Sequence, residues 1–583
     1  MRLVSLFAAL PVVALTGALF SPPADAVTSV SDDGRLEVVE DAATPSRLLY
    51  GRAAVPLPAT PDWEADSTRA IGGMRFGDFN GDDLLDLALG CYQQTGFPPV
   101  NEFWNLIHFN TGSELETDAS WTAAVERHTG DCQVGDVNHD GYDDVYFANG
   151  GNSMQPSTLY LGGPGGPSTT PSWNGTSGVW TVGGALADLD GDGNVDLVQA
   201  CQGNSIIPYR PAQVYTGNGA TFGITPSWTS ADSVISNTAG VADLDGSSTV
   251  SVTAYTLAGD GATHIFRLPQ IALASIDRVE VIPGPTPRFT VNRDAGRIQF
   301  ASAPGAGTTI EVDYSYSTEP DLAFARWVNF ATAVYRNDGG TFPPLPTWDT
   351  GDASATDRGL AFSDVDADGD LDLGLGNSGD PTSWWRNDGG TLVGPVWQAD
   401  AGLFYGTQEI AWGDVDNDGD EDLATIEFSN GHLRVFLNDG GVLETTPSWF
   451  YDFSPSASSL AWGDVNGDGW LDLAAGTARG PATIFYNTGA STDAPEIATG
   501  IAERVTATPN PFQAATTLRG LDPEGGRVEI FDARGARVAE LAAGDAPTWD
   551  GRDASGRAVS PGVYFARQDA REGIRTGRIV RLR

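Results

Sequence analysis

The stretch Asp414-Val415-Asp416-Asn417-Asp418-Gly419-Asp420-Glu421-Asp422 places oxygen-bearing side chains at loop positions 1, 3, 5 and 9, with glycine at position 6. This spacing wraps a tight turn around one hard cation and leaves the carbonyl of position 7 able to join the side-chain oxygens. A short motif that recurs along a chain indicates a repeat architecture. Six related stretches begin at Asp78, Asp136, Asp188, Asp243, Asp364 and Asp464.

Two further markers recur in phase with the acidic loop. The first Asp of successive loops falls at intervals of 58, 52, 55, 121, 50 and 50 residues. An Asn-Asp-Gly-Gly turn follows three of the loops, at residues 337–340, 387–390 and 438–441. A tryptophan lies 15 to 17 residues before every loop, at Trp63, Trp121, Trp173, Trp228, Trp348, Trp397 and Trp449. Three markers that keep one period indicate seven copies of the same unit.

Each unit has the pattern of short β-strands. An alternating stretch such as 471–475 follows the loop, a short apolar stretch such as 460–462 precedes it, and helical periodicity is absent. A unit of about 50 residues with four short strands has the size of a propeller blade, and a closed ring leaves only short edges. The sequence therefore predicts an all-β fold, with a seven-bladed β-propeller over residues 27–490.

The interval of 121 residues predicts an insertion within the fourth blade. Residues 321–335 resemble residues 472–486, so this blade begins near Trp228, breaks off, and resumes near Asp321. The inserted stretch, about residues 268–318, is itself rich in strand signals, because residues 310–316 alternate strictly. At the other end of the propeller, residues 48–51 and 61–63 resemble the tail of a repeat. An N-terminal strand could therefore seal the ring by joining the last blade, or could merely cap its edge.

These units resemble FG-GAP/VCBS repeats, the type that forms the calcium-binding propeller of integrin α-subunits and of many exported bacterial proteins. The resemblance covers residues 47–490 apart from the insertion. It implies a propeller fold with calcium in the acidic loops. It does not specify an activity, because such repeats occur in adhesins, lectin-like modules and enzyme accessories.

The acidic loops predict about five to six Ca²⁺ sites. Position 12 of each loop is not acidic and the flanks are strands, which excludes EF-hands, and Mg²⁺ demands stricter octahedral geometry. Because clustered carboxylates repel each other until an ion binds, we expect the ions to stabilise the blades. The complete sets are Asp188, Asp190, Asp192 and Asp196; Asp364, Asp366, Asp368 and Asp372; and Asp414, Asp416, Asp418 and Asp422. Asn replaces Asp at position 3 in two further sets, Asp136, Asn138, Asp140 and Asp144, and Asp464, Asn466, Asp468 and Asp472.

Two loops depart from the pattern. The first has the ligands Asp78, Asn80, Asp82 and Asp86, but Asp83 stands where glycine is expected. That residue either strains the turn or supplies an additional acid outside the ligand set. The fourth has Asp243 and Asp245, followed by Ser247 and Ser251 at positions 5 and 9. Two carboxylates are few for Ca²⁺, so we predict that this loop is weak or empty.

Composition limits the possible partners and compartments. The formal net charge of −45 argues against nucleic acid, since phosphate binding requires a basic surface. Residues 1–26 resemble a secretory signal peptide cleaved near Ala26; a membrane anchor is the alternative, but Pro11 and Pro22 interrupt a short apolar run. No other segment is apolar enough to span a membrane. The three cysteines exclude a disulfide scaffold; Cys91 and Cys132 could pair, or all three are buried.

The C-terminal part is a separate module. Residues 491–508 form a linker rich in Ala and Thr, and residues 509–583 contain strand and turn signals such as 527–535 and 561–565. This segment resembles the Ig-like C-terminal sorting domain of type IX secretion cargo. The resemblance implies a β-sandwich, passage across an outer membrane, and release or surface anchoring. A generic terminal β-sandwich is the alternative.

The leading hypothesis is therefore a secreted or outer-surface, calcium-stabilised binding or adhesion module, a monomer whose ligand is a protein or a glycan. We predict that it is not an enzyme, because all seven acidic loops occupy equivalent positions whereas a catalytic pair should be singular. The five histidines share no repeat position, and no nucleophile motif is present. The alternatives are a propeller-based polysaccharide lyase or hydrolase, and a structural component of an extracellular assembly.

Overall fold

The computed structural model of the chain contains two compact units, residues 1–491 and 492–583. It describes residues 28–30, 36–38, 55–489 and 506–581 with gaps. The gaps in the third range are at 67, 93–103, 113, 151–153, 177–178, 203–209, 328–329, 353–355, 401–405, 454–455 and 479. Those in the last range are at 509–514, 520, 522–526, 533–536, 543, 545, 553–555, 560–561 and 571–572. The signal peptide predicted at 1–26 and most of the predicted linker lie outside the described residues.

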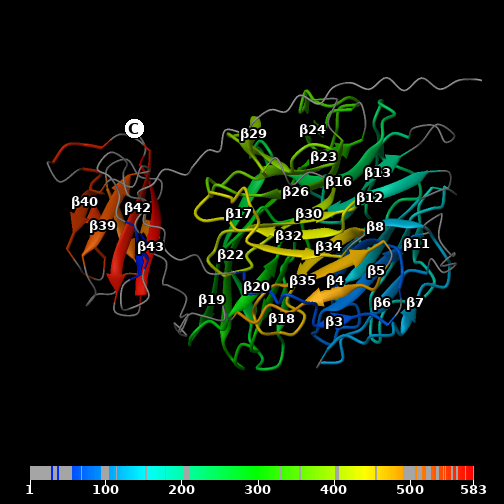
Figure 1. Ribbon diagram of the computed structural model, residues 1–583, viewed down its shortest axis with the longest axis horizontal. Helices are drawn as coiled ribbons and strands as arrows, with labels where there is room; N and C mark the ends of the chain where they lie inside the picture. Colours follow the sequence, from blue (N-terminus) through cyan, green and yellow to red (C-terminus); the bar gives the residue numbers. More distant parts are fainter. Residues whose placement is uncertain are drawn as a thin grey trace, which may run out of the picture. The chain divides into compact units, whose positions relative to one another are not determined.

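The described residues of the first unit form small antiparallel sheets, and seven of these sheets have four strands (Figure 1). We number the seven by the order of their first strands. Sheets 1 to 3 contain β4 (Ile71–Gly77), β5 (Asp86–Cys91), β6 (Leu106–His108) and β7 (Trp121–Thr122); β8 (Thr129–Gly135), β9 (Asp144–Asn149), β10 (Thr158–Tyr160) and β11 (Trp173–Asn174); and β12 (Trp180–Ala187), β13 (Asp196–Gln202), β14 (Gln213–Tyr215) and β15 (Trp228–Thr229).

The fourth sheet is assembled from two distant parts of the chain, because β16 pairs with β23. Sheets 4 and 5 contain β16 (Ser236–Ala242), β23 (Asp321–Arg326), β24 (Ala333–Tyr335) and β25 (Trp348–Asp349); and β26 (Asp357–Ser363), β27 (Asp372–Asn377), β28 (Ser383–Asn387) and β29 (Leu392–Gln398). Sheets 6 and 7 contain β30 (Thr407–Gly413), β31 (Asp422–Glu427), β32 (His432–Phe436) and β33 (Trp449–Asp452); and β34 (Ala457–Gly463), β35 (Asp472–Thr477), β36 (Thr483–Phe485) and β3 (Trp63–Glu64).

The first strands of the seven sheets lie side by side in a closed cycle. Each contacts the first strand of the next sheet, and β34 of sheet 7 contacts β4 of sheet 1. Glycine makes this approach possible, since a Cβ on Gly73 would lie 2.6 Å from the Cα of Asp131 in the next sheet. The N-terminal strand β3 completes sheet 7, where Trp63 pairs with Ile484. Of the two closures considered from the sequence, the structure has the strand that joins the last sheet.

The recurring tryptophan fastens each sheet to the next. Trp121 of sheet 1 donates its indole N–H to the carbonyl of Pro167 at 2.7 Å, and Trp173 of sheet 2 donates to Gly223 at 2.9 Å. The ring of Trp173 also packs edge-on against Phe222 of sheet 3, with centroids 5.3 Å apart. The indole therefore buries a large apolar surface between sheets, and at Trp63, Trp121, Trp173, Trp228 and Trp449 it also satisfies its one polar group there. This contact explains why a tryptophan keeps the period of the repeat.

The insertion lies between β16 and β23 and forms two three-stranded sheets. Their strands share one core, which includes Phe300, Val312 and Tyr314. The strands are β17 (Thr249–Ala258), β18 (Ile265–Arg267), β19 (Ser275–Ile282), β20 (Phe289–Asn292), β21 (Arg297–Phe300) and β22 (Thr309–Ser317). The insertion thus begins earlier than the predicted residue 268, because β17 continues the strand pattern of the repeat but pairs with β22.

The insertion covers one end of the ring of sheets. Gln299 donates to the carbonyl of Asp464 in sheet 7 at 2.7 Å, and Arg293 donates to the carbonyl of Phe362 in sheet 5 at 3.3 Å. Arg297 ion-pairs with Asp143 of sheet 2 at 2.5 Å. These contacts lie at the acidic-loop ends of sheets on different sides of the cycle, so the insertion spans its axis there. Figure 1 shows β17, β19, β20 and β22 together at that side of the first unit.

The second unit contains a three-stranded and a four-stranded antiparallel sheet. Side chains from both sheets, among them Trp549, Ile530 and Ile579, share one core. The strands are β37 (Thr506–Thr508), β38 (Thr516–Arg519), β39 (Val528–Asp532), β40 (Arg537–Leu541), β41 (Thr548–Trp549), β42 (Gly562–Ala570) and β43 (Gly573–Arg581). Strand β37 lies within the predicted linker 491–508 and pairs with β38, so ordered structure begins before residue 509.

Near the N-terminus of the first unit, β1 (Thr28–Val30) pairs antiparallel with β2 (Leu36–Val38) in a separate two-stranded sheet.

Candidate metal centres

Each of the six acidic loops that the insertion does not interrupt connects the first and second strands of its sheet and turns sharply at two left-handed residues. In sheet 3, Gly191 and Gly193 have φ of 72° and 84°. The carboxylate of Asp188 accepts the N–H groups of both glycines at 2.9 Å. Position 4 keeps the left-handed conformation even without glycine, with φ of 57° at His139, 55° at Ala367 and 56° at Asn417. The first-position Asp therefore shapes the turn through its own hydrogen bonds.

The ninth-position Asp ties the loop to the sheet through both of its oxygens. In sheet 3, Asp196 accepts the N–H of Leu189 at 2.9 Å and that of Gly217 at 2.6 Å. The same pair of backbone bonds recurs in every sheet, from position 2 and from the residue two after the third strand, or in sheet 5 from Asn387, the last residue of that strand. The ninth-position residues are Asp86, Asp144, Asp196, Asp321, Asp372, Asp422 and Asp472, and all are buried.

The Asn of the Asn-Asp-Gly-Gly marker connects neighbouring loops. Asn438 of sheet 6 donates its side-chain amide to the carbonyl of Val365 in sheet 5 at 3.0 Å, and Asn387 of sheet 5 donates to Leu244 in sheet 4 at 2.8 Å. Both acceptors occupy position 2 of an acidic loop. The acidic loops and the asparagines thus form one continuous hydrogen-bonded belt across these sheets.

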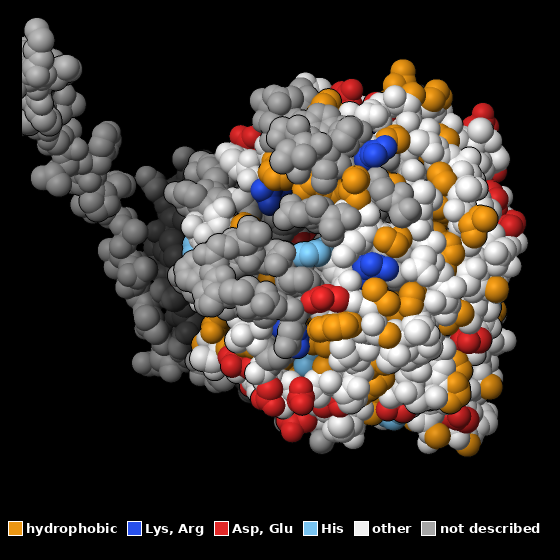
Figure 2. Space-filling view, turned by 90° about the vertical axis from the view of Figure 1, so that its right-hand side faces the viewer, with side chains coloured by type: hydrophobic (Ala, Val, Ile, Leu, Met, Phe, Trp, Pro, Cys, Tyr) orange, Lys and Arg blue, Asp and Glu red, His pale blue; other side chains and the backbone are white. Residues whose placement is uncertain are grey.

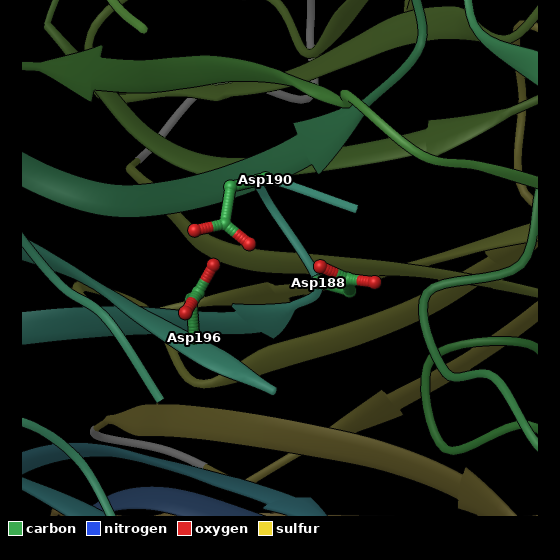
Figure 3. Close-up of side chains that lie close together, drawn as sticks. All are labelled: Asp188, Asp190 and Asp196. Atoms are coloured by element: carbon green, nitrogen blue, oxygen red, sulfur yellow. The ribbon is translucent and has the colours of Figure 1, made fainter. Parts of the chain in front are cut away.

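Three complete loops gather carboxylates closely enough to share an ion. One carboxylate oxygen from each of positions 1, 3 and 9 lies within 4.8 Å of the others (Figure 3 shows sheet 3). The clusters are Asp188, Asp190 and Asp196; Asp364, Asp366 and Asp372; and Asp414, Asp416 and Asp422. The position-5 residues Asp192, Asp368 and Asp418 lie outside these clusters, and each accepts the N–H two residues further on.

The three loops with Asn at position 3 have the same turn but a different side-chain contact. In two of them the Asn amide donates to the position-5 acid, from Asn80 to Asp82 at 3.0 Å and from Asn138 to Asp140 at 2.9 Å. In sheet 7, Asp464 accepts the N–H groups of Asp468 at 3.0 Å and Gly469 at 2.8 Å. An amide that turns its oxygen inward would complete the same oxygen-only donor set.

Several carboxyls of the acidic loops are hard to ionise without a cation. Burial raises the pKa of Asp422 to about 9 and that of Asp86 and Asp144 to about 8. Burial also raises the pKa of Asp414 to about 8, and the neighbouring Asp418 and Asp416 add to the effect. Clustered, buried oxygen donors with this electrostatic cost fit a hard divalent cation.

These shifts predict a specific pH dependence in the absence of divalent ions. For Asp422 the pKa rises from 3.8 to about 9 on folding, so between these values the folded state binds more protons than the unfolded state. The stabilising protonation is present below pH 3.8 and is lost as the pH rises toward 9, so this contribution to the free energy of unfolding falls. We expect the gain in unfolding temperature from added Ca²⁺ to be larger at pH 8 than at pH 5, measured by calorimetry. An equal gain at both values would contradict this prediction.

The fourth loop has a third carboxylate that the sequence analysis did not assign. Asp321 pairs with Ala242 in the sheet, just as Asp196 pairs with Ala187 in sheet 3. Its oxygen clusters with those of Asp243 and Asp245. Ser251, which was counted as position 9, belongs instead to β17 of the insertion. The insertion therefore splits this acidic loop, and the match of residues 321–335 to 472–486 was the signal that locates its ninth position.

Asp83 in the first loop holds the insertion. Its φ is 70°, a left-handed conformation that is strained for a residue other than glycine. Its carboxylate accepts the N–H groups of His264 and Ile265 at the start of β18, the latter at 2.7 Å. The acid is therefore a docking group, and its two hydrogen bonds offset the cost of the left-handed backbone.

Position 8 of the loops contains two further docking acids. This position is the buried Leu85, Val195 or Leu371 in sheets 1, 3 and 5. In sheet 2 it is Asp143 and in sheet 6 Glu421. An acid at an otherwise apolar repeat position indicates a polar partner, but the sequence analysis did not assign a role to these two acids.

Each position-8 acid binds an arginine of the insertion. Asp143 ion-pairs with Arg297 at 2.5 Å and with Arg267 at 3.3 Å, and Glu421 pairs with Arg293 at 2.5 Å. Burial opposes ionisation of Asp143, but the two guanidinium groups outweigh it and lower its pKa. The acidic side of the ring is thus the surface on which the insertion is anchored.

Trp462 and the three cysteines have structural roles. Trp462 donates its indole N–H to the carbonyl of Ala411 in the preceding sheet, at 3.4 Å, and is partly buried between sheets 6 and 7. The three cysteines are buried and free. None of the described residues belongs to a helix that is long and apolar enough to cross a membrane.

Comparison with known proteins identifies the repeat. The model of the FG-GAP-like repeat matches residues 136–198, 364–425 and 414–475. Each match begins at the first Asp of an acidic loop and ends in the second strand of the next sheet. No curated protein matches the chain.

Solved structures similar to the chain have low identity. PorZ, described as an essential bacterial surface component of the type-IX secretion system of Porphyromonas gingivalis, has 15% identity, a TM-score of 0.34 and coverage of 96% of this chain; the chain spans 63% of that protein. BBS1N in complex with ARL6DN has 10% identity, a TM-score of 0.41, and coverage of 74% of this chain and 98% of that one. A lectin of Agrocybe aegerita that recognises non-reducing terminal N-acetylglucosamine has 14% identity, a TM-score of 0.32, and coverage of 66% and 80%. The chain thus contains FG-GAP-like repeats in three places, each built around two consecutive acidic loops.

Proposed function

We propose that the chain is an exported, calcium-stabilised, seven-bladed β-propeller that acts as a binding or adhesion module. The seven four-stranded sheets are its blades, and β3 closes the ring. The second unit is the C-terminal β-sandwich that serves sorting or anchoring. The observation that carries the calcium assignment is the clustering of carboxylate oxygens within 4.8 Å in complete loops. About five to six loops hold Ca²⁺, and their role is to fasten the blades.

The position of the insertion limits where a ligand can bind. The insertion occupies the acidic-loop end of the ring, where it contacts Asp83, Asp143 and Glu421. A ligand would therefore bind at the opposite end or on the insertion itself. At the opposite end, where β31 ends and β32 begins, the partly exposed His432 lies with its Nδ1 3.1 Å from the buried Glu427, which also pairs with Arg434. Figure 2 shows the face turned away from the insertion, where basic, acidic and histidine side chains lie together near the centre. Such a mixed polar surface suits a protein or glycan ligand at the cell surface or outside the cell.

A glycan array and a pull-down of extracellular proteins test this proposal. The full mature protein is applied with calcium and, in parallel, after chelation. We expect retention of a glycan or protein partner without turnover, and weaker retention after chelation because the blades lose order. The variant His432→Ala, whose residue is partly exposed and distant from the acidic loops, should reduce binding without changing the calcium content. Release of shortened oligosaccharides from a polysaccharide would overturn the binding assignment in favour of a lyase or hydrolase.

A further inference from the structure

An arginine lies within the acidic cluster of the fourth loop. Arg336 follows the third strand of sheet 4, and its Nη1 is 2.6 Å from Oδ2 of Asp321 and 3.7 Å from Oδ2 of Asp245. Its Nη2 donates to the carbonyl of Gly390 in sheet 5 at 2.7 Å. The guanidinium therefore brings positive charge to two of the three carboxylates that would otherwise share an ion.

The third carboxylate of this loop is satisfied by hydroxyl groups. Oδ2 of Asp243 accepts three hydrogen bonds: from the hydroxyl of Thr249 at 2.7 Å, from the hydroxyl of Ser248 at 3.2 Å and from the N–H of Ser248 at 3.1 Å. In the complete loops the corresponding oxygen accepts a single glycine N–H, as Asp364 does from Gly369 at 3.0 Å. These donors occupy lone pairs of one of the two oxygens of Asp243, so this acid is partly satisfied without a metal ion.

The neighbouring sheet provides an internal comparison. Arg386 occupies the same repeat position in sheet 5, two residues before the Asp of the Asn-Asp-Gly-Gly turn. Its Nε and Nη2 bind the two oxygens of Asp388 at 2.7 and 2.9 Å. The ligands Asp364, Asp366 and Asp372 still cluster within 4.8 Å beside it. The repeat position alone therefore does not bring an arginine into the acidic cluster. Arg386 stays outside the cluster of sheet 5, whereas Arg336 lies within that of sheet 4.

We propose that Arg336 is a built-in cation that takes the place of the metal ion in the fourth loop. This inference rests on the proposed calcium binding only for the identity of the ion that is replaced. The insertion separates Asp243 and Asp245 from Asp321 along the chain. A bound ion would therefore have to keep together two parts of the loop that are joined only through the whole insertion. A guanidinium attached to the next strand of the same sheet keeps these acids together whether or not calcium is present.

The test counts calcium ions on the full chain by equilibrium dialysis and atomic emission. We expect Arg336→Gln to bind one ion more per chain than the wild type, because three carboxylates then lack a counter-charge, as in the loops with Asn at position 3. The matched variant Arg386→Gln should leave the count unchanged. An unchanged count in Arg336→Gln, or an equal gain in Arg386→Gln, would overturn the proposal.

A second pair of variants separates Arg336 from the missing position-5 acid. Ser247→Asp supplies that acid; we expect no additional ion in this variant and one additional ion in Ser247→Asp with Arg336→Gln. Purification of the double variant in calcium secures a folded protein if Arg336→Gln alone does not fold. An additional ion in Ser247→Asp alone would show that the serine, and not the arginine, keeps the loop free of metal. A wild type that binds no calcium would refute the proposed function, whereas a gain specific to Arg336→Gln would still support this inference.

Discussion

Chelation of calcium should lower the unfolding temperature of the first unit by roughly 10 °C or more. Each ion at a concentration a hundredfold above its Kd contributes about 2.7 kcal/mol. Five such sites stabilise the ring by an amount on the order of 10 kcal/mol, and in a unit of this size 1 kcal/mol corresponds to about 1 °C. The effect should be large because removal of the ions leaves buried acids such as Asp422 and Asp472 without a counter-charge. Calorimetry of the full chain with and without chelator measures it.

The second unit provides the internal control for this experiment. It contains no acidic loop among its described residues, so its own transition, followed through the buried Trp549, should not move. Added Ca²⁺ should restore the first transition, and Mg²⁺ should restore it poorly, because these loops offer flexible oxygen ligands. Asp422→Asn should remove part of the shift. An unfolding temperature that is the same with and without chelator would refute the calcium role.

Asp143→Asn should destabilise the first unit by about 3–5 kcal/mol, because it leaves two arginines in contact with an uncharged partner inside the protein. Asp143 and Arg297 have side chains that are 1% and 3% exposed, so water cannot replace the lost charge. Asp143 also accepts the N–H of Asp78 at 2.8 Å and thereby joins sheets 1 and 2 to the insertion. We expect a lower unfolding temperature and faster proteolysis within residues 249–317.

Two control variants distinguish a buried network from a general loss of charge. Glu280→Gln removes an exposed partner of Arg278 on the insertion and should change stability by at most about 1 kcal/mol. Replacement of the network by apolar residues, with Asp143→Leu, Arg267→Met and Arg297→Met together, should recover most of the loss, because position 8 is leucine or valine in other sheets. Equal stability and equal protease resistance of Asp143→Asn and the wild type would contradict the anchoring role.

The repeat could be read from the sequence because its markers act locally. The acidic loop, the tryptophan and the asparagine each make the same contact in one sheet after another, so their spacing predicts one unit of all-β structure. The clustering of Asp188, Asp190 and Asp196 follows the spacing in the same way. The spacing predicts the position-5 acids as ligands but does not show that Asp192 also accepts the backbone N–H of Asn194.

The remaining features depend on contacts between distant residues. Asp321 was missed as a loop residue because the insertion separates it from Asp245, and only the pairing of β16 with β23 brings them together. Asp143 and Glu421 acquire their roles from arginines more than a hundred residues away. The insertion was placed too late in the chain because the alternation of β17 does not reveal whether its partner is a strand of the repeat or of the insertion.

The closing strand has a consequence for how the molecule is made. Asp62 accepts the N–H of Tyr486, a residue 424 positions later, and Trp449 donates to the carbonyl of Pro58 across 391 positions. Sheet 7 therefore cannot be completed until nearly the whole first unit has left the ribosome, and the entropic cost of joining such distant ends falls on one late step. Until then the chain is an open arc with an unpaired edge on β36. For the export proposed above, this order keeps the ring open while the chain crosses a membrane, since sheet 7 closes only after the last repeat has followed the first.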